Sequence, residues 1–188
     1  MSGVVAEQIP AFRHRSAHPD ARYELGCLYI GVNDVLSPGW DATRFESGFR
    51  QALTYVATRC DLVLVLTVPL DLGRPRAGRK VIECNAAIER VAADVGVRVT
   101  DLRDFRGRNL VMADHVHPTA FGQIAIAERV LATLAADGIT ARVMPAELIR
   151  YGVTRWGRLR GGWTYGYRRV KISARHGAKL AFSRIPRG

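Results

Sequence analysis

The run DLVLVLTVP at residues 61–69 is the feature that most restricts the fold of this chain. Leucine and β-branched residues follow one another there without polar alternation, which is typical of a parallel strand covered on both faces. Amphipathic helical patterns flank the run on both sides. The helix before it has its apolar side chains at Phe45, Phe49, Ala52, Leu53 and Val56. The helix after it covers residues 81–96 and stops at Gly96. A parallel strand between two amphipathic helices predicts an α/β fold.

The rest of the first 136 residues continues the alternation. The segment LGCLYIGVND at residues 25–34 predicts a buried strand and the loop at its carboxyl end, and Asp41 or Thr43 can cap the helix that follows. VRVTDL predicts a third strand. Pro118 stands at an expected first helical position, and the apolar face of that last helix consists of Ile124, Ala127, Leu131 and Leu134. In such sheets we expect ligands outside the carboxyl ends of the strands.

Charge divides the chain in two. Residues 1–136 carry 16 Lys/Arg and 15 Asp/Glu, whereas residues 137–188 carry 12 and 2, so nearly all of the net charge of +11 belongs to the end of the chain. This asymmetry predicts a domain over 1–136 and a basic extension over 137–188. The extension interleaves arginines with Trp156, Trp163, Tyr165 and Tyr167, a composition suited to weak contact with nucleic acid or anionic lipid, and also found in plain basic appendages. Its glycines argue against a single clean amphipathic helix.

Cysteine spacing and hydropathy indicate the cellular compartment and whether the chain spans a membrane. Cys27, Cys60 and Cys84 are odd in number, widely spaced and without a C-x-x-C pair, which favours buried free thiols over disulfides or a zinc site. No apolar run reaches 18 residues, and MSGVVAEQIP lacks the basic and apolar regions of a signal peptide. We expect a cytoplasmic protein without a transmembrane segment.

Two polar clusters follow the predicted strands. In NLVMADHVHPTAFGQ, Asp114 and His117 stand three apart, so the carboxylate can hold Nδ1–H of the imidazole and leave Nε2 as a general base. The plain alternative is that Asp114 caps the helix and His117 is a loop residue. In IGVND, Asn33 can donate its amide to an oxyanion beside a tight turn at Gly31, or can simply belong to that turn.

His115 allows a further interpretation. With Asp114 and His117 it could bind zinc or iron, but a third protein ligand is hard to find, since His14 and His18 lie in a polar N-terminal loop. We expect no metal, and His115 as a solvent-facing neighbour.

Together, GVND after a strand and DHVHP before a helix resemble two blocks of the SGNH hydrolase family, also called GDSL esterases and lipases. The resemblance covers about residues 1–136. It implies a flavodoxin-like, three-layer α/β/α sandwich with a parallel sheet, and a Ser-His-Asp mechanism on carboxylic esters. In it, Asn33 is an oxyanion-hole donor, His117 and Asp114 are catalytic, Gly31 and Pro118 support the site, and no cofactor is needed.

The chain departs from this family in one block. The family's serine lies in a G-D-S segment after the first strand, and this sequence contains no such segment. SGVVAEQIPAF instead resembles the helix after the second block. We expect a shortened protein whose nucleophile and first strand lie upstream of Met1, and whose strand ending at Gly31 is left with an open edge. The alternative function is a non-catalytic relic or binding module whose basic extension makes the contacts.

Overall fold

The computed structural model describes residues 3–15, 21–149 and 154–183. They belong to two compact units. The first unit comprises Met1–Leu70 and Ala77–Phe105, and the second comprises Asp71–Arg76 and Arg106–Gly188. The division into 1–136 and 137–188 stays a prediction.

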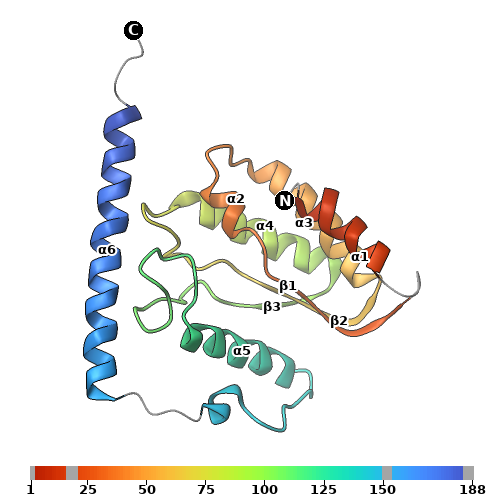
Figure 1. The fold of residues 1–188 in the computed structure, drawn as a ribbon. Coiled ribbons are helices and arrows are strands. Elements are labelled where there is room, and N and C mark those ends of the chain that lie inside the picture. Colours follow the sequence, from red (N-terminus) through yellow and green to blue (C-terminus); the bar gives the residue numbers. More distant parts are fainter. Residues whose placement is uncertain (1–2, 16–20, 150–153, 184–188) are drawn as a thin grey trace. The chain divides into compact units, whose positions relative to one another are not determined.

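The first unit is built on a parallel sheet. Figure 1 labels its strands β1 (Tyr23–Leu28), β2 (Cys60–Leu66) and β3 (Arg98–Thr100), and they pair in the order β1-β2-β3. Cys27 pairs with Leu64, and Leu66 pairs with Thr100. The central strand buries residues 63–66 one after another, as its unbroken apolar run predicts. The parallel α/β architecture is confirmed.

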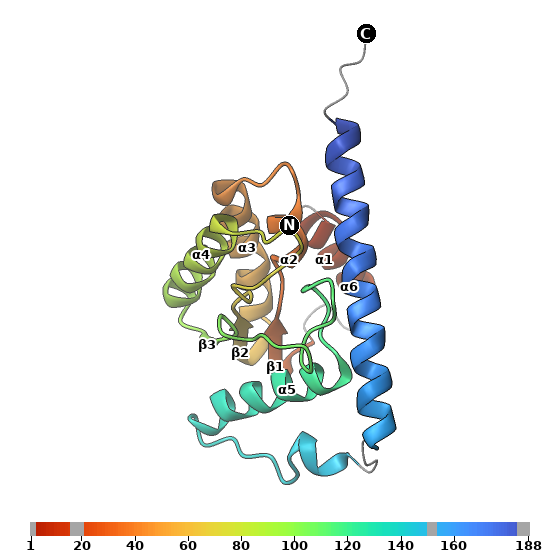
Figure 2. The same cartoon turned by 90° about the vertical axis from the view of Figure 1, so that its left-hand side faces the viewer.

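Helices α3 (Ala42–Ala57) and α4 (Arg79–Val95) cover one face of this sheet, on which the views of Figures 1 and 2 agree. The Asp41 carboxylate accepts a hydrogen bond from the Arg44 amide at 2.9 Å, so Asp41 rather than Thr43 caps α3. Gly96 ends α4 in the left-handed conformation, with φ of 77°. Between them the two helices bury the aromatic and aliphatic side chains of Phe45, Phe49, Leu53, Val81, Ile88 and Val91.

The N-terminal segment is helical, as expected from SGVVAEQIPAF. A short π-helix, η1 (Val4–Gln8), continues into α1 (Ile9–Arg15). His14 therefore lies in a helix, and the prediction of a loop around it was wrong. His18 lies outside the described residues.

Strand β1 is not buried, in contrast to the prediction from its apolar run, and among the described strands it has the open edge that we expected. Within the described sheet it has a neighbour only on the β2 side, and Tyr23 is 39% exposed and Leu25 44% exposed. An apolar run predicts a strand, but burial also requires a neighbour on each side.

Cys84 is the buried cysteine of the three, while Cys60 is half-buried and Cys27 exposed, which corrects the expectation of three buried thiols.

The second unit contains α5 (Ala120–Ala135), the 3-10 helix η2 (Pro145–Leu148) and α6 (Arg155–Ser183). Thr119 is the N-cap of α5, and its hydroxyl accepts from the Gly122 amide at 3.0 Å. Pro118 accordingly precedes the cap instead of occupying the first helical position.

Helix α6 is one continuous helix despite Gly157, Gly161, Gly162 and Gly166, although these glycines argued against a single clean amphipathic helix (Figure 1). Of the helices in the described ranges, none combines the length and apolar character that a membrane span requires.

Candidate active site

Asp114 and His117 form the hydrogen-bonded pair that their spacing predicts. Nδ1–H of His117 donates to Oδ2 of Asp114 at 2.8 Å, while Oδ1 accepts the amides of Val116 and His117 at 2.9 and 3.1 Å. The imidazole side chain is 69% exposed. Its Nε2 is therefore left toward solvent in the tautomer that can accept a proton.

The surroundings keep the Asp114 carboxylate ionised. Partial burial raises the pKa of this carboxyl, but the bonds from the His117 ring and from the two amides outweigh burial, and the pKa lies below its ordinary value. An ionised carboxylate can hold Nδ1–H and can stabilise an imidazolium formed during proton transfer.

A network of backbone hydrogen bonds shapes the loop that carries this pair. Val111 and Pro118 form an antiparallel bridge, and the Met112 amide donates to the His117 carbonyl at 2.8 Å. Gly122 packs against this loop so closely that a Cβ there would lie 1.9 Å from the Leu110 carbonyl oxygen. The loop and the first turn of α5 thus form one packed structure around Asp114 and His117.

His115 is not the solvent-facing neighbour that the sequence suggested. Its side chain is 13% exposed, its Nδ1 lies 2.9 Å from Oδ2 of Asp71, and its Nε2 lies 2.7 Å from Nη2 of Arg74. Asp71 also pairs with Arg76 at 2.6 Å. Sequence reasoning missed Asp71 and Arg74, because 44 and 41 residues separate them from His115 and no local pattern marks them.

The metal alternative gains no further ligand. Within the described ranges, no three His, Cys, Asp or Glu side chains gather as a metal-binding group. Both ring nitrogens of His115 have protein partners.

In the first unit, Gly31 and Asn33 follow β1. Gly31 has φ of 111°, and a Cβ on it would lie 2.8 Å from Sγ of Cys84 and 3.2 Å from Cζ of Phe45. The turn at this position therefore depends on glycine. Asn33 lies in the short helix α2 (Val32–Leu36) and is exposed, so its amide is accessible for donation.

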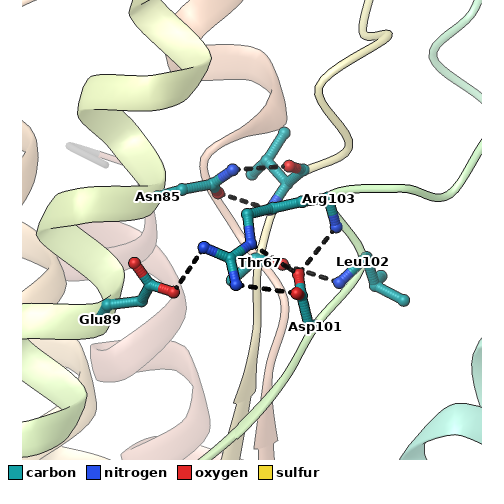
Figure 3. A network of polar contacts seen from close by, with 7 residues as sticks. Thr67, Asn85, Glu89, Asp101, Leu102 and Arg103 are labelled. Atoms are coloured by element: carbon teal, nitrogen blue, oxygen red, sulfur yellow. Dashed lines mark hydrogen bonds and ion pairs between the residues drawn. The ribbon is translucent and has the colours of Figure 1, made fainter.

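A buried asparagine at the carboxyl end of β2 was also missed. Asn85 of α4 accepts from the Val68 amide at 2.7 Å and donates to the Val68 carbonyl at 2.8 Å (Figure 3). Its position on the apolar face of a helix was the available signal, since buried amides need partners.

A second group of contacts joins the ends of β2 and β3. The Thr67 hydroxyl donates to the Asp101 carboxylate at 2.9 Å and accepts from the Leu102 amide at 2.7 Å. Nε and Nη2 of Arg103 donate to the same carboxylate, as Figure 3 shows. The Arg103 bonds are the main cause that lowers the pKa of Asp101 to about 2, against the opposing effect of burial. These contacts fix the loops that leave both strands.

Comparison with known proteins agrees with the fold. The model of the GDSL-like lipase/acylhydrolase family matches residues 2–125. The comparison with curated proteins gave no match.

Solved structures similar to the chain include two lipolytic enzymes of the same kind as this family and one α/β hydrolase. An α/β hydrolase, LAE5, from the metagenome of Lake Arreo has 16% identity and a TM-score of 0.56, over 70% of this chain and 67% of that one. A lipase/acylhydrolase from Enterococcus faecalis has 17% identity and a TM-score of 0.51, over 72% and 67%. A member of the lipolytic G-D-S-L family from Veillonella parvula has 21% identity and a TM-score of 0.52, over 68% and 71%.

At these identities the likeness concerns the fold, and the expected three-layer sandwich is consistent with it. The family itself follows from the match of its model over most of the sequence. The chain belongs to the GDSL-like lipase/acylhydrolase family.

Proposed function

We propose that the protein hydrolyses carboxylic esters of small molecules by a Ser-His-Asp mechanism in which His117 is the base and Asp114 its partner. The observation that carries the proposal is the 2.8 Å hydrogen bond between Nδ1 of an exposed His117 and Asp114. Family membership supports acyl-bond hydrolysis as the reaction class.

Hydrolysis would proceed through an acyl-enzyme in two stages. Nε2 of His117 takes the proton of a serine hydroxyl while the serine oxygen bonds to the acyl carbon, and the side-chain amide of Asn33 donates to the oxyanion. The carbon–oxygen bond to the alcohol then breaks, and His117 returns the proton to the leaving oxygen. Water, deprotonated by the same base, releases the acid and restores the serine.

The experiment has to establish whether a serine nucleophile is present. The sequence contains no G-D-S segment, and a strand upstream of Met1 that ends in Gly-Asp-Ser stays a prediction. Hydrolysis of p-nitrophenyl acetate and butyrate should be measured for this chain and for an N-terminally extended protein, each with and without a chelator. We expect no activity in this chain, and in the extended protein an activity that His117→Ala abolishes and the chelator leaves intact.

The other outcomes separate the alternatives. Loss of activity with chelator would favour a metal-dependent enzyme that uses His115 and His117. An inactive extended protein that binds no ester would favour a non-catalytic binding module.

We propose as a second function that α6 contacts anionic lipid. Residues 155–183 contain eight Lys/Arg and no Asp or Glu. Apolar side chains spaced three and four residues apart, and therefore on one side of the helix, stay 63–83% exposed: Trp156, Leu159, Trp163, Tyr167 and Val170. A basic helix with an apolar, Trp-bearing face suits the interface of a charged membrane.

Vesicle cosedimentation tests this second function. We expect binding to phosphatidylcholine vesicles that contain phosphatidylglycerol, no binding to phosphatidylcholine alone, and weaker binding after joint Trp156→Ala and Trp163→Ala substitution. Tyr165→Ala, on another side of α6, is the control. Binding to DNA that the tryptophan substitutions leave unchanged, without vesicle binding, would assign the extension to nucleic acid instead.

A further inference from the structure

We propose that His115 is a positioning residue that holds the Asp114–His117 pair in its working geometry, through Asp71 and Arg74 of the loop at residues 71–76. This inference rests on the proposed function, because positioning matters to catalysis only if His117 is the base. Its structural content, however, can be tested without any substrate.

One ring nitrogen of His115 accepts a hydrogen bond, and the other donates one. A guanidinium can only donate, so Nε2 of His115 accepts from Arg74 at 2.7 Å. The proton then resides on Nδ1 and is donated to Oδ2 of Asp71 at 2.9 Å. The two neighbours thereby select one tautomer and one ring orientation, in a side chain that is 13% exposed.

Asp71 is itself held in place. Its Oδ1 lies 2.6 Å from Nη2 of Arg76. Arg76, Asp71, His115 and Arg74 therefore form a continuous chain of charged or polar contacts that joins residues 71–76 to the loop that carries the base. The Gly73 amide adds a backbone bond to the His115 carbonyl at 2.9 Å.

The backbone conformation of His115 explains why these side-chain contacts affect Asp114, Val116 and His117. His115 has φ of 58°, in the left-handed region that residues other than glycine seldom adopt. The chain reverses at this residue, and the amides of Val116 and His117 both donate to Oδ1 of Asp114. A side chain bonded at both ring nitrogens opposes the return of this residue to an ordinary backbone conformation.

Substitution by glycine separates the backbone from the side chain. His115→Gly adopts positive φ readily but removes both ring contacts. If the left-handed backbone alone shapes the loop, glycine should serve as well as histidine. If the ring contacts position the pair, the glycine variant should loosen it.

Amide exchange and carboxyl NMR are the readouts that need no activity. In His115→Gly we expect the Val116 and His117 amides to exchange at least roughly tenfold faster, with the amides of α4 unchanged. The pKa of Asp114 should rise toward the ordinary aspartate value, because its lowering depends on bonds from His117 and Val116. His14→Ala, at an exposed histidine of α1, should change neither quantity.

Arg74→Met provides a second variant if the glycine substitution compromises folding. It removes the contact to Nε2 and leaves Asp71 and the His115 backbone in place, so a smaller change in the same direction is expected. In the active extended protein, both variants should lower kcat and leave KM nearly unchanged.

Unchanged exchange at Val116 and His117, together with an unchanged pKa of Asp114, would overturn the positioning role. Altered exchange and NMR in a protein that hydrolyses no ester, even unsubstituted, would uphold the positioning of the pair and reject the proposed function. The two proposals can therefore fail separately.

Discussion

Oδ2 of Asp114 lies 2.8 Å from Nδ1 of His117, and Oδ1 of the same carboxylate accepts the backbone amide of that histidine at 3.1 Å. One carboxylate therefore orients both the ring and the backbone of the proposed base. In Asp114→Asn the amide cannot reproduce the charged acceptor, and the ring can take the other tautomer. In the N-terminally extended protein, we expect kcat for ester hydrolysis to fall by roughly 10³–10⁴-fold, with the far-ultraviolet circular dichroism unchanged.

Asp61→Asn is the matched control, because this carboxylate is 64% exposed and pairs with Arg22 on the surface. It should leave kcat unchanged. Similar kinetic losses in both variants would show that the effect of Asp114→Asn is not specific to the pair.

Gly31→Ala should destabilise the first unit. The new Cβ would require a left-handed alanine and would lie 2.8 Å from Sγ of the buried Cys84. Together these effects should lower the free energy of unfolding by about 2–4 kcal/mol in urea titrations. At Gly39 an added Cβ would meet only Oγ of Ser37 at 4.0 Å, so Gly39→Ala should change stability by less than about 0.5 kcal/mol.

Asn85→Ala tests the bridge to Val68. It leaves a buried amide and a buried carbonyl without their partner, at a cost of about 1–3 kcal/mol for each group. Thermal and urea unfolding should both reveal the loss. Ile82→Ala on the same helix, at a side chain that is 61% exposed, is the control and should have little effect; equal losses would argue against a structural role of the bridge.

Asp101 should make stability depend on pH in acid. Chiefly through its bonds from Arg103, its pKa is about 2 in the folded protein, below the ordinary 3.8. Since the folded value is the lower one, the stabilisation is present above about pH 3.8 and disappears as the pH falls toward 2.

Asp101→Asn should therefore be less stable than the unsubstituted chain at neutral pH, and the difference should shrink between pH 4 and 2 in urea titrations. Glu89→Gln removes only the outer contact of Arg103 and should retain most of the acid dependence. A difference between Asp101→Asn and the unsubstituted chain that stays constant with pH would contradict the assignment.

The open edge of β1 should promote self-association. Leu25 is 44% exposed on this strand, and unpaired edges with apolar side chains favour pairing between chains. Leu25→Lys should lower the concentration-dependent increase in mass that sedimentation velocity measures. Ile82→Lys, an equally drastic change on α4, should not; equal reduction by both would attribute association to general hydrophobicity.

Local patterns account for what could be predicted. Helices α3 and α4 follow from side chains three and four residues apart, β2 follows from consecutive apolar residues, and the Asp114–His117 contact spans three positions. These signals lie within one element or loop, where geometry is set by nearby residues.

Contacts between distant segments could not be predicted in the same way. His115 meets Asp71 across 44 residues, so the sequence near His115 says nothing of its partner. The apolar run of β1 predicted burial, whereas the absence of a G-D-S segment was the signal for its open edge. Helix α6 continues through four glycines, whose low helix propensity favoured an interrupted segment.

Because Sγ of Cys84 lies next to Gly31, the rate of chemical labelling of Cys84 can measure how often the turn after β1 opens. The Cys84 side chain is fully buried and the pKa of its thiol is raised to about 12, mainly by burial, so alkylating reagents should react with it only when this part of the fold opens. The rate at which Cys84 is labelled, compared with the exposed Cys27, would thus report how often the segment that carries Asn33 leaves its native conformation.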